Sequence, residues 1–333
     1  MKIMIKYIIL IPVFLLMTNC KTGNSKKEEV NIKEPLRLPV IMDTDANNEL
    51  DDQHAIAYML LNSDVFDVWG ITVNATRNGG DIDQHYQEAI RVIKLSGVKD
   101  IPVLKGANAS FSAIRPTINN NSFDGKSAVD FIINSAREIE GSKLILMPIG
   151  KLTNIALALS RAPDIKDKVR IVWLGSNYPE PGEYNQDNDT TALNYILNTA
   201  VPFEMVTVRY GKASGSDAVR ITPDEVNQHL KGKGPKVAPV TGRHGGEFTC
   251  FGDYSVSLFS QIDLYGDPPS RALFDLVAVA VVKNPDWGNQ VEIPAPVLID
   301  NKWAERPGNR RKITIWENFN KEAILEDLYT VFN

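Results

Sequence analysis

The sequence predicts an α/β protein with a mostly parallel, Rossmann-like central sheet flanked by helices. Short apolar runs of strand character alternate along most of the chain with segments of helical periodicity. The strand-like runs are apolar at consecutive residues, which is typical of parallel strands covered on both faces. Acidic and polar residues directly follow several of these runs, where ligands bind in such sheets. We therefore expect a single domain over residues 36–333 with a loop or lid insertion.

The expected elements alternate from the start of this domain. The segment "DDQHAIAYMLLNS" has apolar residues at helical spacing, and Gly97 closes the helix after the next strand. Residues 212–260 break the alternation, are rich in glycine and proline, and are expected to form the lid. Strands are expected over 37–45, 66–75, 101–107, 143–150, 168–176 and 202–210, and helices over 51–63, 81–97, 151–163, 190–200 and 271–285.

Composition and charge limit the classes of function. The net charge is -5 and 43% of the residues are hydrophobic, which is ordinary for a globular protein. No broad basic surface is indicated, so we expect no nucleic-acid partner. Beyond Cys20 the chain has one cysteine, Cys250, which cannot form an internal disulfide. A buried, inert Cys250 is favoured over a reactive thiol.

Residues 1–20 are predicted to be a lipoprotein signal peptide. Lys2 and Lys6 precede an apolar run over 7–17, which is too short to span a bilayer comfortably. The position of Cys20 resembles a bacterial lipoprotein cleavage site, although Asn19 stands where glycine, alanine or serine is expected. Residues 21–35 have the composition of a flexible tether. We expect an exported protein anchored in a bacterial membrane, facing the periplasm or cell surface, by a lipid on Cys20; plain secretion is the alternative.

The stretch "DTDANNELDD" concentrates acids directly after the first expected strand. Asp43, Asp45, Asp51 and Asp52 would raise one another's pKa if they remained unpaired, and a hard divalent cation relieves this. Ca²⁺ takes carboxylate and carbonyl oxygens, and no nearby histidine or cysteine cluster favours zinc. In the alternative interpretation, Asp51 and Asp52 only begin a helix. Asp-x-Asp alone also occurs in haloacid-dehalogenase-type phosphatases and glycosyltransferases, which do not explain the second pair.

With both acidic pairs in view, the sequence resembles the inosine-uridine-preferring nucleoside hydrolase family. The family motif Asp-x-Asp-x-x-x-Asp-Asp is present, but five residues instead of three separate its halves. This longer form is closer to a divergent branch found in secreted bacterial proteins. The segments "MPIGKLTNIALAL", "NYPEPGEYNQDND" and "LFDLVAVA" resemble further family motifs in the same order. The resemblance covers about residues 37–330.

The resemblance implies calcium-dependent hydrolysis of the N-glycosidic bond of a ribonucleoside or related ribosyl compound. Water held by calcium would attack C1′, with Asp45 as general base and calcium ligand. A homodimer or homotetramer is also implied, and Asp43 is expected to brace the loop. The other implied calcium ligands are Asp52, the carbonyl of Ile149, and Asp275. The implied ribose contacts are Asp51, Asn177, Glu183 and Asn185.

Departures from the family pattern leave the substrate open. Phe274 stands where pyrimidine-active members have a histidine that protonates the base, and where purine-specific members have a stacking aromatic residue. It could equally be a core phenylalanine. His244 in the expected lid is a substitute acid or an exposed loop residue. Ala75-Thr76 replaces a usual Gly-Asn, for which Asn74 could compensate.

The insertion of two residues places Asn47, Asn48 and Glu49 near the expected metal and is expected to reshape the sugar pocket. Two alternatives to the nucleoside hydrolase therefore stay open. One is a surface lipoprotein that binds a sugar or nucleoside without cleaving it. The other is a hydrolase of a different glycoside, since inverting glycosidases also place two carboxylates around a water.

Overall fold

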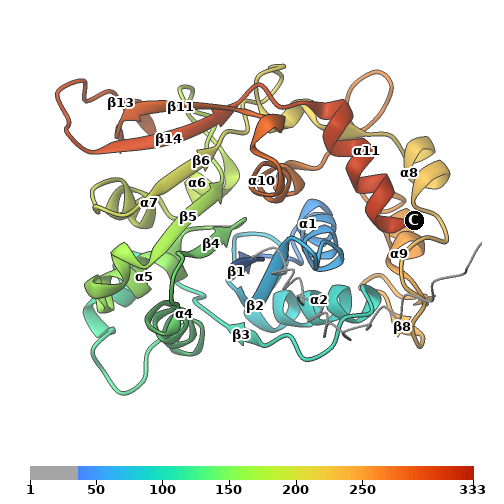
Figure 1. Cartoon of the computed structure of the whole chain (residues 1–333), viewed down its shortest axis with the longest axis horizontal. Coiled ribbons are helices and arrows are strands. Elements are labelled where there is room, and N and C mark those ends of the chain that lie inside the picture. Colours follow the sequence, from blue (N-terminus) through green and yellow to red (C-terminus); the bar gives the residue numbers. More distant parts are fainter. Residues whose placement is uncertain (1–36) are drawn as a thin grey trace, which may run out of the picture. The chain divides into compact units, whose positions relative to one another are not determined.

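The main sheet has eight strands, and all but the edge strand β11 run parallel to their neighbours (Figure 1). The computed structural model describes residues 37–333, so the expected signal peptide (1–20) and tether (21–35) lie outside the described residues. The predicted mostly parallel α/β sheet is confirmed. In spatial order its strands are β11 (Asn289–Pro294), β14 (Lys312–Glu317), β6 (Phe203–Val206), β5 (Val169–Leu174), β4 (Leu144–Pro148), β1 (Leu38–Thr44), β2 (Phe66–Val73) and β3 (Val103–Lys105).

Helices cover both faces of this sheet, and each face has its own apolar core (Figure 1). Successive strand residues point to opposite faces, so Val40 and Met42 of β1 join one core and Ile41 joins the other. This double burial explains why the strands are apolar at consecutive positions. The first core includes α1 (Asp51–Leu61), α2 (Ile82–Leu95), α9 (Phe251–Phe259), α10 (Phe274–Lys283) and α11 (Lys321–Phe332); the second includes α3 (Phe111–Ile114), α4 (Lys126–Glu138), α5 (Thr153–Arg161) and α7 (Thr190–Leu197).

Residues 212–260 contain more regular structure than the expected loop region. Tyr254 of α9 donates a hydrogen bond to the buried carboxylate of Glu88 in α2 (2.6 Å), and His54 of α1 shares one with Ser255 (2.7 Å). These bonds fix α9 to the two helices on one face of the sheet, so this part of the expected lid is packed onto the flank of the domain. The segment holds β7 (Arg220–Ile221), α8 (Pro223–His229), β8 (Val240–Thr241) and β9 (Glu247–Phe248).

The antiparallel end of the sheet was not expected from the sequence. β11 is mostly exposed, and β14 mixes buried residues with partly exposed polar ones, so neither shows the continuous apolar run of a central strand. Helices α4 and α11 were also not expected, although their buried residues follow helical spacing. The remaining short elements are α6 (Tyr184–Asn188), β10 (Arg271–Ala272), β12 (Val297–Ile299) and β13 (Lys302–Ala304).

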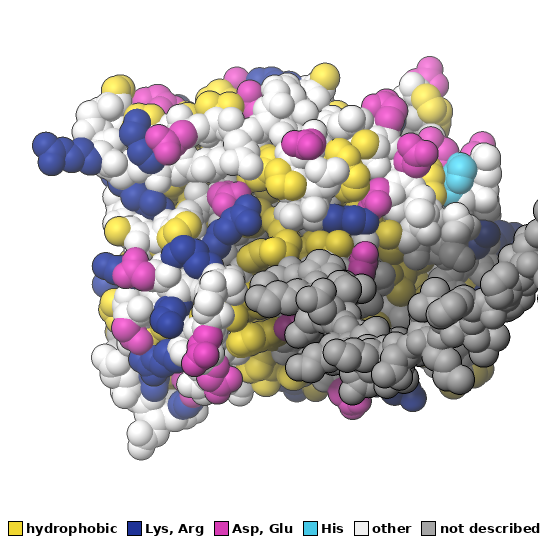
Figure 2. Space-filling model, viewed as in Figure 1, with side chains coloured by type: hydrophobic (Ala, Val, Ile, Leu, Met, Phe, Trp, Pro, Cys, Tyr) yellow, Lys and Arg dark blue, Asp and Glu magenta, His cyan; other side chains and the backbone are white. Residues whose placement is uncertain are grey.

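On the face drawn in Figure 2, lysine and arginine side chains are interspersed with aspartate and glutamate. Charges of opposite sign therefore lie close together on this face, where they screen one another. Among residues 37–333, no helix combines the length and the apolar character that a membrane span needs.

Candidate active site

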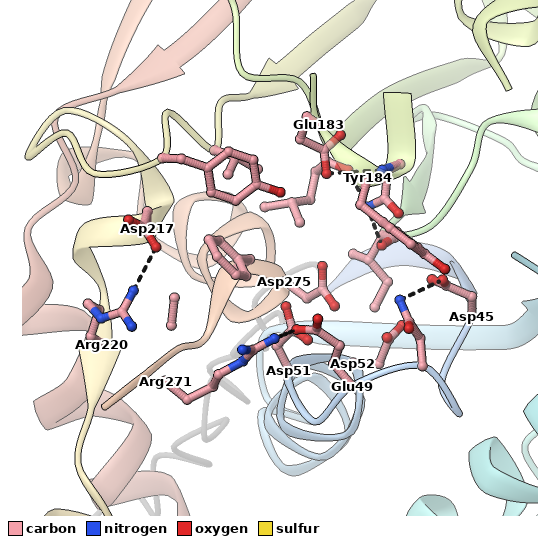
Figure 3. A pocket seen from close by; sticks show the side chains of 18 of the residues that line it. Asp45, Glu49, Asp51, Asp52, Glu183, Tyr184, Asp217, Arg220, Arg271 and Asp275 are labelled. Carbon is pink, nitrogen blue, oxygen red and sulfur yellow. Dashed lines mark hydrogen bonds and ion pairs between the residues drawn. The ribbon is translucent and has the colours of Figure 1, made fainter. Parts of the chain in front are cut away.

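A cavity of about 320 Å³ opens beyond the carboxyl ends of the parallel strands (Figure 3). The loops that leave β1, β4, β5 and β6 all contribute to its wall, which is the usual ligand position in such sheets. Most of the residues predicted for the site are brought together here. The lining residues are Asp45, Asn48, Glu49, Asp51, Asp52, Ile149, Leu174, Glu183, Tyr184, Asn185, Val208, Tyr210, Asp217, Arg220, Tyr265, Arg271, Ala272, Phe274 and Asp275.

Three buried carboxylates form the floor of the cavity. Asp51, Asp52 and Asp275 each offer an oxygen within 4.8 Å of the others (Figure 3). Asp51 and Asp52 begin α1, and Asp275 lies in the first turn of α10, so two helix N-termini face the same point. Burial, followed by the negative charge of neighbouring acids, raises the pKa of all three, that of Asp51 to about 7. The cluster therefore resists full ionisation unless positive charge is supplied.

Asp45 lies beside this trio but is not part of it. Its carboxylate accepts a hydrogen bond from Thr76 and a longer one (3.5 Å) from Asn48. Burial raises its pKa, and its charge in turn raises the pKa of Asp52. A Cβ atom at Gly150 would lie 2.6 Å from Asp45 Oδ1, so only glycine allows this close approach. The observed three-carboxylate group thus contains Asp51 where the implied ligand set had Asp45.

The donor set fits a hard divalent cation. Every side chain in the buried trio is a carboxylate, and the described cavity wall contains no histidine or cysteine that would favour zinc. Ile149 lines the cavity as expected, and its carbonyl accepts a hydrogen bond from Asn185 Nδ2 (2.9 Å), which orients that peptide. Asp52 and Asp275 belong both to the implied ligand set and to the observed group.

Glu183 and Asn185 occupy the wall opposite the trio. Glu183 is the N-cap of α6, and its carboxylate accepts hydrogen bonds from the backbone N–H groups of Ser176 (2.8 Å), Asn185 (3.0 Å) and Gln186 (2.8 Å). Burial raises its pKa to about 7 despite these three bonds, which favour the charged form. Asn185 also donates to the carbonyl of Leu174 (3.2 Å). The segment is thus a rigid shelf that places both side chains at the cavity.

Asn177 does not reach the cavity wall. Its side chain donates to the carbonyl of Pro181 (3.1 Å) and accepts from the backbone N–H of Tyr210 (2.9 Å). It therefore holds together the loops after β5 and β6, both of which carry lining residues. His244 is also outside the cavity: it is exposed and accepts a hydrogen bond from Arg243 Nε (3.0 Å). The structure gives neither residue a contact with the space where a substrate would bind.

The predicted bracing role of Asp43 is confirmed. Its buried carboxylate accepts hydrogen bonds from Thr72 (2.6 Å), Asn154 (2.7 Å) and Asn74 (3.0 Å). It thereby ties the end of β1 to β2 and α5. Burial raises its pKa to about 7, although the three bonds act in the opposite direction. Asn74 is used in this brace and does not line the cavity, so it does not replace the missing family contact.

The cavity wall also contains charged residues outside the predicted ligand and ribose-contact set. Glu49, from the two-residue insertion, forms an ion pair with Arg271 of β10, and Arg220 of β7 forms another with Asp217 (2.7 Å). The first pair joins segments 222 residues apart in the chain, whereas the second is local. Of these four charged residues, the sequence pointed only to Glu49, through its position inside the insertion. Phe274 lines the cavity and packs edge-to-face against Tyr210, with ring centroids 5.9 Å apart.

The fold and the cavity first define a class: an α/β protein whose buried carboxylates gather beyond the carboxyl ends of parallel strands, with oxygen ligands suited to a divalent cation. The family model described as "Inosine-uridine preferring nucleoside hydrolase" matches residues 40–326. The chain belongs to this family.

Two curated relatives and one solved structure illustrate the similarity. An uncharacterized protein of Schizosaccharomyces pombe is 27% identical over 208 residues, 55% of this chain and 65% of that protein. The pyrimidine-specific ribonucleoside hydrolase RihA of Shewanella woodyi is 27% identical over 189 residues, 50% of this chain and 59% of that protein. The matches thus span about three fifths of the relatives' length. A purine-preferring ribonucleoside hydrolase from Gardnerella vaginalis shares the fold, with a TM-score of 0.64 at 22% identity over 88% of this chain and 98% of that chain.

Proposed function

We propose that the protein hydrolyses the N-glycosidic bond of a ribonucleoside or a related ribosyl compound and uses Ca²⁺ to do so. The observation that carries this proposal is the meeting of the buried side chains of Asp45, Asp51, Asp52 and Asp275 at one cavity. Family membership supports the reaction class. The carboxylate donors, with the carbonyl of Ile149, support a hard cation.

Asp52 and Asp275 are the proposed carboxylate ligands, because they satisfy both the family resemblance and the observed grouping. A bound cation would neutralise part of the acidic cluster, hold the ribose hydroxyls and lower the pKa of a nearby water. Asp45 is the proposed general base. It lies at the edge of the cluster, and its raised pKa brings its basicity nearer to neutral pH, where a general base is most effective.

The remaining polar groups suit a ribose ring. Asp51 on the floor and Glu183 and Asn185 on the opposite wall can accept or donate hydrogen bonds to the sugar hydroxyls. Carboxylates on both sides of the sugar also stabilise the positive charge that develops on the ring as the C1′–N bond lengthens. Asn177 is left out of this set, because its side chain is used between two loops.

The test is hydrolysis of nitrophenyl riboside and a panel of nucleosides, with added calcium and with chelator. We expect calcium-dependent release of ribose, and a loss of at least about 100-fold in kcat for Asp45→Asn. Asp187→Asn, in α6 but outside the cavity wall, is the matched control and should keep its activity. Calcium-independent turnover would contradict the role of the metal. Calorimetric binding of ribose without turnover of any substrate would favour the non-catalytic binding protein.

Export, the lipid anchor on Cys20 and a homodimeric or homotetrameric assembly are further proposals that rest on the sequence. Metabolic labelling with a fatty acid tests the anchor: label should enter the native protein and not the Cys20→Ala variant. Sedimentation of the purified protein tests the assembly. A purely monomeric species at micromolar concentration would contradict it.

A further inference from the structure

The segment 46–49, which we call the inserted loop because it lies within the two-residue insertion, is held by hydrogen bonds to the rest of the domain. Its last two residues, Asn48 and Glu49, line the cavity. The backbone N–H of Asn47 donates to Nδ1 of the buried His85 in α2 (3.2 Å). A supporting contact of this kind limits the positions that the loop's side chains can take at the cavity.

The main anchor of the inserted loop is the side-chain amide of Gln53 in α1. Its Nε2 donates to the carbonyls of Ala46 (2.7 Å) and Glu49 (3.2 Å), which are the two ends of the loop. Gln53 is fully buried and does not line the cavity. Among the described residues, the Oε1 of this amide has no hydrogen-bond partner, and a buried acceptor without a partner costs stability. The amide is therefore turned toward the loop although its own oxygen stays unpaired.

Glu88 of α2 orients the Gln53 amide. Its Oε1 accepts hydrogen bonds from Gln53 Nε2 (3.0 Å) and from the hydroxyl of Tyr254 in α9 (2.6 Å). Its Oε2 pairs with Arg91, whose Nε donates to the carbonyl of Thr241 (2.7 Å). Because both oxygens of this buried carboxylate are engaged, its side chain is fixed. The contacts form a continuous chain from Thr241 at the edge of the domain to the inserted loop.

The inserted loop in turn places two side chains at the wall of the cavity. Glu49 forms its ion pair with Arg271 next to Asp51, so the position of the loop also fixes this guanidinium group (Figure 3). Asn48 makes the long hydrogen bond to Asp45 (3.5 Å). A displaced loop would therefore change the wall that faces the sugar. The proposed metal ligands would be less affected, because α1 and α10 carry them.

We propose that Gln53 and Glu88 are positioning residues for substrate binding. They act through the backbone of the inserted loop and set the affinity for the ribosyl substrate without touching it. This inference rests on the proposed function and assigns a role to two buried side chains outside the cavity wall. Loss of either role should weaken binding of the substrate and of the transition state alike, so KM should change more than kcat.

The test measures kcat and KM for nitrophenyl riboside, with calcium, in Gln53→Met, which keeps the size of the side chain and removes its amide. We expect KM to rise roughly fivefold, as for the loss of about one hydrogen bond, and kcat to stay within about twofold. Asn62→Leu is the matched control, because Asn62 is a buried amide at the other end of α1 and donates to the carbonyl of Tyr58 (2.8 Å). It lies outside the cavity wall, and its KM should equal that of the wild type.

Two further variants separate positioning from general damage. Tyr254→Phe removes one of the bonds that orient Glu88 with little change of shape, and it should raise KM by a smaller factor than Gln53→Met. Glu49→Gln weakens the ion pair with Arg271 and should reduce the effect of Gln53→Met on KM, because both changes act through the same loop. Strictly additive effects in the double variant would contradict this path.

Hydrogen exchange measures the loop without turnover. The backbone amides of residues 46–50 should exchange faster in Gln53→Met than in the wild type or in Asn62→Leu. Unchanged exchange at the loop would overturn the inference, as would an unchanged KM, and both results leave the proposed function standing. A loss of calcium affinity in calorimetry as large as the rise in KM would also overturn it, because Gln53 would then act through the metal.

A wild type that cleaves no riboside would reject the proposed function itself. The affinity for ribose, measured by calorimetry, would then replace KM in the same comparison of Gln53→Met with Asn62→Leu. A fivefold weaker affinity in Gln53→Met alone would support the positioning role. Equal affinities in the two variants would overturn it.

Discussion

Replacing Asp51 should make the calcium-free protein more stable while it weakens the site. Asp51 is only 7% exposed, and burial together with its acidic neighbours raises its pKa from 3.8 to about 7. A carboxyl group with a raised pKa binds its proton more tightly in the folded state than in the unfolded state. The fold therefore loses stability as pH rises from about 4 to about 7.

The size of the expected stability difference follows from the shift in the pKa of Asp51. Roughly three pKa units at 1.36 kcal/mol each amount to about 4 kcal/mol at pH 8. Asp51→Asn removes the charge and keeps the size, so in chelator the variant should exceed the wild type by up to about 4 kcal/mol at pH 8. At pH 4.5 the same calculation gives a stability difference between the two proteins of only about 1 kcal/mol. With calcium the wild type should be more stable than the variant, because calcium binding stabilises the wild type more strongly.

Urea unfolding at both pH values, with chelator and with calcium, measures these differences directly. Asp187→Asn serves as the control for removal of one negative charge outside the cavity, and its stability difference should stay within about 0.5 kcal/mol. The reasoning is refuted if Asp51→Asn is less stable than the wild type in chelator at pH 8. It is equally refuted if the difference between the two proteins is the same at pH 4.5 and pH 8.

Three further predictions follow from the placement of single side chains. Asn177→Ala should change KM for nitrophenyl riboside by less than about threefold but lower stability by about 1 kcal/mol, because it loses its bond to the Tyr210 backbone; a KM change of tenfold or more would restore a ribose contact. His244→Ala should leave kcat unchanged between pH 6 and pH 8, since the imidazole lies outside the cavity; a loss of an ionisation from the pH profile would contradict this. Glu183→Gln should raise KM, because an amide has a single oxygen with which to accept the three backbone bonds that hold this wall in place; an unchanged KM would count against this positioning role.

The predictable part of the fold is its parallel centre. Strands such as β4 and the first part of β1 are buried on both faces, so their sequences are continuous apolar runs that need no tertiary information to be recognised. The edge pair β11 and β14 lacked that signal, because a strand with exposed positions resembles many loops. The glycine-rich segment 231–249 read as a loop, but bonds from its surroundings, such as Arg91 Nε to the Thr241 carbonyl (2.7 Å), hold it against α2. Hydrogen-bond partners this far away in the chain cannot be recognised from the local composition of a segment.

The residues of the site also include some that the sequence could predict and some that it could not. Asp51 and Asp52 could be predicted, because acids that follow a buried strand and begin a helix must lie at the carboxyl edge of a sheet. The role of Asn177 could not be predicted from the sequence. Its position matches a family motif, but its side chain hydrogen-bonds to the backbone of two segments and does not line the cavity. Arg271 gave no signal at all, since a single arginine in a mixed segment is ordinary until Glu49 is found beside it.

The sequence by itself determined the parallel α/β architecture, the family, and the presence of an acidic cluster at the end of the first strand. Periodicity and residue type carry that information, because each depends on neighbours within a few positions. The family resemblance already grouped Asp275 with Asp52. Only the tertiary structure decided that Asp51 is the third member of that group, that Asp45 stands beside it, and that Arg271 is paired with Glu49. Several of those facts depend on contacts between segments far apart in the chain, such as Glu49 and Arg271, which are 222 residues apart. The charge that a substrate meets in the cavity is a sum over all of these segments.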